Sequence, residues 1–185
     1  HHGGAFYSAR PLVATAPALA VVTAFRLPVY RSEETKPILA DVASMREPGD
    51  ALYVYYGAER AVRFYGPRAG IDPSEVTFGS CHRGHPREYL RELDRLRRRS
   101  RVWVVFAHAS PLERQTMSGY LGRIGKRRLR FEAPGAAAEL YDLSEAERLR
   151  ASDAETYPIL EGNPDRAEEY GCGHGPIGAT PPGWR

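Results

Sequence analysis

The feature that most constrains the fold is an unbroken apolar run of six residues, Val102 to Ala107, in the middle of the chain. Arg101 precedes this run, and the polar residues His108 and Ser110 follow it. A short run rich in branched and aromatic residues is typical of a central strand that is covered on both faces. The run therefore indicates a sheet with helices packed against each of its sides.

Strands and helices are predicted to alternate on either side of this run. The helices are indicated by apolar residues three to four apart, by prolines in first turns, and by the capping box of Ser110 and Glu113. The strands are indicated by branched and aromatic residues between turn signals. The predicted helices are 35–47, 58–65, one that begins at Pro86, and one from Pro111 to about Gly125. The predicted strands are 52–56, 76–78, 102–107, 128–132 and 137–141.

Strands separated by helices imply right-handed crossovers and a mostly parallel sheet. The last two strands flank Pro134 and Gly135, and they are expected to form a hairpin that adds an antiparallel edge. The predicted fold is α/β, a three-layer Rossmann-like domain with a mostly parallel sheet of about five strands and a C-terminal antiparallel hairpin.

Composition divides the 185 residues into three parts. Residues 1–29 include an uncharged stretch, 11–25, which is shorter than the ~18–20 apolar residues of a spanning helix. A truncated membrane helix, an interfacial segment and a buried helix all fit this stretch. The first is favoured, so 1–29 is interpreted as the end of a membrane-associated segment. Residues 30–144 form the predicted α/β domain, and the acidic, Pro/Gly-rich residues 145–185 are expected to be a loosely ordered tail.

The charge of the chain is unevenly distributed, although the net charge is only +3. Residues 81–130 contain fourteen Lys/Arg and four Asp/Glu, whereas residues 131–185 contain four and eleven. A basic region attracts anionic partners such as lipid headgroups or phosphorylated sugars, although a solvated, arginine-rich helix face is the simpler explanation. No nucleic-acid partner is expected, because no known motif matches and the basic triplets 97–99 and 126–128 follow helices, where cations complement the dipole.

The stretch Asp50–Gly66 has the order of strand, turn and helix that nucleotide-binding units use. A Rossmann loop requires glycines at three set places, and only Gly57 stands in this turn. The lysine of a P-loop is missing, and Glu59 would repel a phosphate. The pattern therefore favours a structural role for this stretch.

A ligand could still bind at the edge of the sheet where parallel strands end. The candidate ligand-binding residues at that edge are Tyr56, Gly57, Arg60 and His108. The pair of His108 and Ser110 does not indicate a hydrolase, because the nucleophile elbow G-x-S-x-G is absent and Ser110 is explained as a helix cap. No catalytic residue and no cofactor are predicted.

Cys81, His82 and His85 carry side chains that zinc prefers, and Cys172 and His174 follow far downstream. Their spacing does not match a zinc site, because no C-x-x-C pair is present. Loop residues before a helix are the simpler explanation. The sequence therefore predicts no metal site.

Three segments, taken in order, resemble one family. They are R-S-E-E-T-K-P-I-L-A-D-V followed by P-G-D-A-L-Y-V-Y-Y-G-A-E-R-A-V-R-F-Y, then L-D-R-L-R-R-R-S-R-V-W-V-V-F-A-H, then Y-L-G-R-I-G-K-R-R-L-R-F-E-A-P-G-A-A-A-E-L-Y-D-L-S. This set resembles the C-terminal soluble domain of polytopic bacterial membrane glycosyltransferases similar to dolichyl-phosphate-mannose protein mannosyltransferases. The resemblance covers about Tyr30 to Ser144. The preceding residues 3–22 look like the end of the last membrane helix of that family.

The resemblance implies a part of an enzyme that transfers a sugar from a polyprenyl-phosphate donor on the outer side of a membrane. In this family the catalytic acidic residue lies in an early outer loop, so no residue of this chain inherits a catalytic role. The implied location is the membrane, with the domain on the extracytoplasmic side. The implied partners are the membrane domain of the same polypeptide and anionic lipid or polyprenyl-phosphate. The alternative is a free-standing Rossmann-like module that binds a small phosphorylated ligand.

Overall fold

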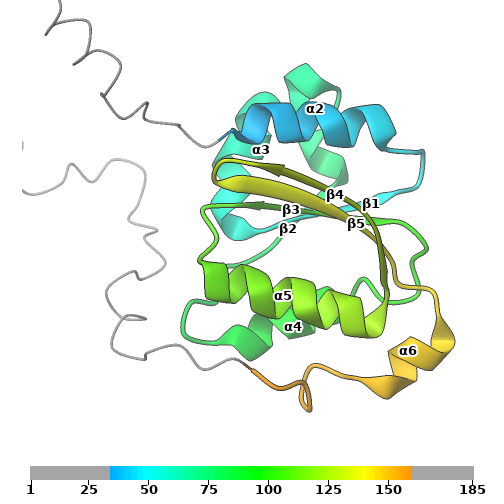
Figure 1. Ribbon diagram of the computed structural model, residues 1–185. Coiled ribbons are helices and arrows are strands. Elements are labelled where there is room, and N and C mark those ends of the chain that lie inside the picture. The colour runs from blue at the N-terminus through cyan, green and yellow to red at the C-terminus, as the bar shows by residue number, and fades with distance from the viewer. Residues whose placement is uncertain (1–33, 160–185) are drawn as a thin grey trace, which may run out of the picture. The chain divides into compact units, whose positions relative to one another are not determined.

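The computed structural model describes residues 34–159, and these residues build one five-stranded sheet with helices on both of its faces (Figure 1). The strands are β1 Ala51–Val54, β2 Val76–Phe78, β3 Val102–Ala107, β4 Lys126–Ala133 and β5 Ala136–Asp142. The helices are α2 Thr35–Met45, α3 Glu59–Tyr65, α4 Pro86–Asp94, α5 Pro111–Ile124 and α6 Ala146–Ala151. Short 3-10 turns lie at Tyr56–Ala58, Pro67–Ala69 and Pro73–Glu75.

The sheet is mixed, with the strand order β2-β1-β3-β5-β4. Strand β1 runs parallel to both of its neighbours, β2 and β3, whereas β5 runs antiparallel to β3 and β4. Strands β4 and β5 form the predicted hairpin, in which Gly135 takes a φ of 71° that suits glycine. The α/β class, the five strands and the C-terminal antiparallel hairpin are therefore confirmed, and the parallel part comprises β1, β2 and β3.

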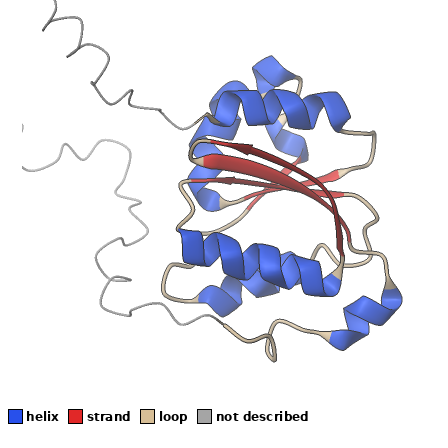
Figure 2. Ribbon diagram, viewed as in Figure 1, coloured by secondary structure: helices blue, strands red, loops and turns tan. Residues whose placement is uncertain are grey.

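Strand β3 lies in the centre of the sheet, and all six of its residues are buried, as the apolar run predicts. Its side chains alternate between two hydrophobic clusters. Trp103 and Val105 pack in the cluster of α2 and α3, and Val104 and Phe106 pack in the cluster of α4 and α5. Helices therefore cover both faces of the sheet within the described residues (Figure 2).

Two elements, β1 and α2, end two residues earlier than the sequence predicts, and both differences have local causes. Strand β1 ends at Val54, because Tyr56 already belongs to the 3-10 turn that leads into α3. Helix α2 ends at Met45, because the backbone of Arg46 is extended and the N–H of Glu47 donates to the carboxylate of Asp50 at 2.9 Å.

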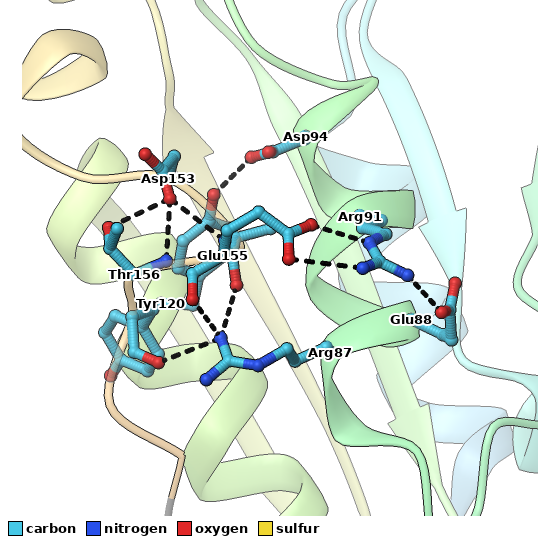
Figure 3. A network of polar contacts seen from close by, with 10 residues as sticks. Arg87, Glu88, Arg91, Asp94, Tyr120, Asp153, Glu155 and Thr156 are labelled. Atoms are coloured by element: carbon cyan, nitrogen blue, oxygen red, sulfur yellow. Dashed lines mark hydrogen bonds and ion pairs between the residues drawn. The ribbon is translucent and has the colours of Figure 1, made fainter.

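The first part of the predicted tail, residues 145–159, packs against the domain. Arg87 Nη1 donates to the carbonyl oxygens of Ala154 and Glu155, at 2.9 and 2.5 Å, and Arg91 Nε lies 2.8 Å from the Glu155 carboxylate (Figure 3). Hydrogen bonds from an ionised guanidinium are stronger than those between neutral groups. These arginines of α4 therefore fasten the chain after α6 to the domain.

A third arginine, Arg97, follows the C-terminal end of α4 and holds the same segment. Arg97 donates to the carbonyl oxygens of Leu149 and Ser152, at 2.6 and 2.7 Å, and pairs with Asp94 at 2.7 Å. Part of the basic charge of residues 81–130 therefore binds this chain's own backbone. The remainder of the predicted tail, 160–185, lies outside the described residues, as does the predicted membrane-associated segment 1–29.

None of the helices within residues 34–159 is long and apolar enough to span a bilayer.

Candidate functional site

The predicted ligand edge lies where β1 and β3 end side by side. Both strands point the same way, so the residues that follow them emerge at one edge of the sheet. The chain leaves β1 for β2 on one side and then crosses to β3 on the other side. Such a reversal of strand order is the place where open α/β sheets bind ligands.

Gly57 brings the two strand ends into direct contact. A Cβ atom built on Gly57 would lie 2.6 Å from the carbonyl oxygen of Ala107 and 3.1 Å from Cβ of His108. The structure thus places Tyr56, Gly57 and His108 together, as predicted. His108 is exposed and has a φ of 55°, an uncommon conformation for a residue with a side chain.

Tyrosine side chains fill the space beside this turn. Tyr55 is fully buried, and its ring lies 4.5 Å from that of Tyr56 between centroids. The Tyr56 ring stacks with that of Tyr89 at 6.4 Å, and the guanidinium of Arg83 lies 5.6 Å from its centroid. The rings of Tyr55, Tyr56 and Tyr89 therefore pack together beside the turn, against the cluster of α4 and α5.

The buried tyrosines act as hydrogen-bond donors. Tyr55 donates to Glu113 Oε2 at 2.8 Å, and Tyr89 donates to Glu113 Oε1 at 3.2 Å. Burial, followed by neighbouring tyrosine and glutamate groups, raises the pKa of Tyr55 well above its ordinary value. Glu113 also closes the predicted capping box with Ser110, which the structure confirms. This carboxylate therefore anchors the start of α5 to α4 and to Tyr55, the residue after β1.

Among the described residues, no contact links the side chain of Arg60 to this edge. It is exposed on α3, which packs on the face of the sheet opposite to α5. Its assignment as a ligand residue remains a prediction.

We expect Gly57→Ala to lower the free energy of unfolding by about 1–3 kcal/mol. The added methyl group would meet a backbone oxygen of β3 at 2.6 Å, which has little room to move. Thermal unfolding followed by circular dichroism measures this effect. The control is Gly122→Ala, since a Cβ at Gly122 meets nothing within 4 Å and alanine favours the helix. An unchanged midpoint for Gly57→Ala would contradict close packing at this turn.

Two of the residues considered for metal binding, Cys81 and His82, have other partners. Cys81 is disulfide-bonded. Cys172 and His174 lie outside the described residues. His82 Nε2 lies 3.0 Å from Glu92 Oε1, and His85 is exposed before α4. Residues 34–159 hold no cluster of three His, Cys, Asp or Glu side chains placed to bind a metal ion.

A second candidate site, not predicted from the sequence, is a hollow of about 570 Å³ between α5 and the β4–β5 hairpin. We call it the α5–hairpin hollow. It is lined by Ala109, Pro111, Arg114, Gln115, Ser118, Gly119, Arg127, Arg130 and Glu139. Its volume lies in the range of small-molecule sites, ~300–1,000 Å³.

The register of the sheet explains why these charges meet. Glu139 lies between Ala138 and Leu140, which face α2, so its own side chain faces α5. Arg130 is paired with Glu139 across the hairpin and shares that face. Ser118 lies one helical turn after Arg114 on α5, so the helix presents both to the hairpin.

Glu139 is fully buried, and its carboxylate is only partly satisfied. Its Oε2 accepts a hydrogen bond from Tyr141, and its Oε1 has no hydrogen-bond partner. Arg127 Nη1 and Arg130 Nε lie 3.7 and 3.8 Å from the carboxylate oxygens, beyond hydrogen-bond distance. Ser118 Oγ, also buried, has no partner either. Buried polar atoms of this kind call for a water molecule or a ligand.

Comparison of this chain with protein-family models, with curated proteins and with solved structures finds no match.

Proposed function

We propose that this chain is the C-terminal extracytoplasmic domain of a membrane glycosyltransferase that uses a polyprenyl-phosphate-sugar donor. In this role the domain is non-catalytic, and its partner is the membrane domain of the same polypeptide. We also propose that its fold is a three-layer Rossmann-like domain.

The proposal starts from the ordered resemblance of residues 30–144 to such domains. The resembling segments include α2, β1, α3, β3, β4 and β5 of the structure. These elements form most of the sheet and one of its two helical faces. The resemblance therefore falls on the body of the fold rather than on scattered loops.

The packing beside the strand ends is the observation that supports a non-catalytic role. Tyr55, Tyr56 and Tyr89 pack together beside the turn that follows β1, and Gly57 lies against the end of β3. A doubly wound sheet binds its nucleotide at such strand ends. This packing counts against the alternative, a free-standing module that binds a small phosphorylated ligand at Gly57 and His108.

The disulfide of Cys81 supports the extracytoplasmic location. Disulfides persist in oxidising compartments and are rare in the cytosol of mesophiles. Anionic lipid and polyprenyl-phosphate remain proposed partners on electrostatic grounds, given the basic residues 81–130.

The coding sequence upstream of His1 in the parent gene tests this function. We expect several hydrophobic spans, with an acidic residue in the first outer loop. A parent gene without membrane spans would refute the proposal. The purified chain should transfer no sugar from a polyprenyl-phosphate donor, and transfer by this chain alone would contradict the non-catalytic role.

A further inference from the structure

The α5–hairpin hollow contains buried polar atoms that have no hydrogen-bond partner within the described residues. Glu139 is fully buried, yet Oε1 has no hydrogen-bond donor, and Ser118 Oγ has no partner. A buried carboxylate oxygen without a hydrogen-bond donor is costly, even with guanidinium groups nearby, so Glu139 Oε1 is placed to accept a hydrogen bond from a bound molecule.

The surroundings of the hollow favour an anion. Arg114, Arg127 and Arg130 line it, and the carboxylates nearby are those of Glu139 and Glu132. Three guanidinium groups against two carboxylates leave a net positive charge. Arg127 is 42% exposed, and its only described polar contact is the 3.7 Å ion pair with Glu139. Its N–H groups are therefore available to a ligand, and guanidinium groups bind phosphate well.

The other groups that line the hollow can form hydrogen bonds with the hydroxyl groups of a ligand. Glu139 Oε1 can accept a hydrogen bond, and Ser118 and Gln115 can both donate and accept. No aromatic side chain lines the hollow, so a nucleobase would find no ring to stack on. We propose that the α5–hairpin hollow binds a small phosphorylated sugar, with Arg127 and Arg130 holding the phosphate and Glu139 accepting a sugar hydroxyl.

This site is separate from the strand edge of Tyr56 and His108, and it does not depend on the proposed membrane function. A free sugar phosphate and the headgroup of a lipid-linked sugar present the same chemistry. A soluble probe tests that chemistry, and a short-chain prenyl-phosphate sugar then shows whether a lipid tail adds affinity.

The test is isothermal titration calorimetry of the full 185-residue chain with three probes: glucose 1-phosphate, inorganic phosphate and glucose. Glucose 1-phosphate should bind about tenfold more tightly than phosphate, because only the sugar satisfies Glu139. Glucose alone should bind more weakly than glucose 1-phosphate. If no probe binds at millimolar concentration, or if the sugar adds nothing to phosphate, the proposal is wrong.

Matched variants locate the site. Arg127→Gln with Arg130→Gln should abolish binding of both phosphorylated probes. Arg128→Gln is the control: it lies on the same strand and pairs with Asp142 outside the hollow, so affinity should not change. Equal losses in the Arg128 control and the double variant would refute the site.

Glu139→Gln separates the two halves of the ligand. This variant should bind phosphate at least as tightly as the natural chain, because a competing negative charge is removed. It should lose most of the preference for glucose 1-phosphate over phosphate. Circular dichroism confirms that each variant is folded, and Ser118→Ala gives a second, gentler change at the sugar side. An unaltered preference in both Glu139→Gln and Ser118→Ala would overturn the assignment of the hydroxyl site.

Discussion

Replacement of Asp50 by alanine is expected to lower the free energy of unfolding by about 3 kcal/mol. The Asp50 carboxylate is buried and accepts four hydrogen bonds. They come from the N–H of Glu47 at 2.9 Å, the indole of Trp103 at 3.0 Å and the guanidinium of Arg101 at 2.7 and 3.2 Å. Alanine would leave the buried indole N–H without an acceptor. Chemical denaturation measures the loss, and a change below about 1 kcal/mol would contradict this role.

The effect of this substitution should depend on pH. Burial on its own raises the pKa of Asp50, but hydrogen bonds from Arg101, Glu47 and Trp103 outweigh it and lower the pKa below the ordinary value of 3.8. A carboxyl group with a lowered pKa stabilises the fold above its unfolded pKa and loses that contribution as the pH falls through its folded pKa. The difference between Asp50→Ala and the natural chain should therefore shrink below about pH 4. Asp41→Ala, at an exposed position of α2, is the control and should have little effect.

Replacement of Trp103 by alanine is expected to destabilise the fold by about 3–5 kcal/mol. Trp103 is among the largest fully buried side chains of the described residues and stacks against Phe131, with centroids 6.0 Å apart. Alanine would leave a cavity beneath α2 and remove a donor to Asp50. Phe64→Ala is the matched control, because Phe64 is 57% exposed, and it should cost less than about 1 kcal/mol. Similar denaturation midpoints for the two variants would contradict the central position of β3.

Much of the fold could be predicted from local patterns. The run 102–107 is fully buried because β3 has a strand on either side and helices on both faces. The capping box of Ser110 and Glu113 lies within four residues, so its geometry is local and the sequence indicates it directly. The turn at Pro134 and Gly135 sets the hairpin in the same way.

The candidate strand edge was only partly predictable. Parallel pairing of β1 and β3 was enough to bring Tyr56 and Gly57 to His108. The stacking of Tyr56 beside that edge depends on α4, which is distant in sequence and supplies Tyr89. No contact of the described residues tests whether Arg60, exposed on α3, reaches this edge.

The α5–hairpin hollow was missed, although one signal was present. Glu139 is the one charged residue between Ala136 and Leu140, and a hairpin that turns at 134–135 pairs position 139 with Arg130. The register thus predicts a buried carboxylate beside an arginine. The approach of α5 to that face could not be predicted, because it follows from packing rather than from local pattern. The same holds for the arginines that fasten residues 145–159.

We propose that this domain lies on the outer side of a membrane as part of a larger glycosyltransferase. The most direct measurement is protease digestion of intact spheroplasts that carry the natural protein with a C-terminal epitope tag. Without protease, we predict that the tag is recovered in the membrane fraction. With external protease, the tagged domain should be removed from intact spheroplasts before lysis. A domain that is recovered in the soluble fraction, or that resists protease until the cells are lysed, would contradict the account.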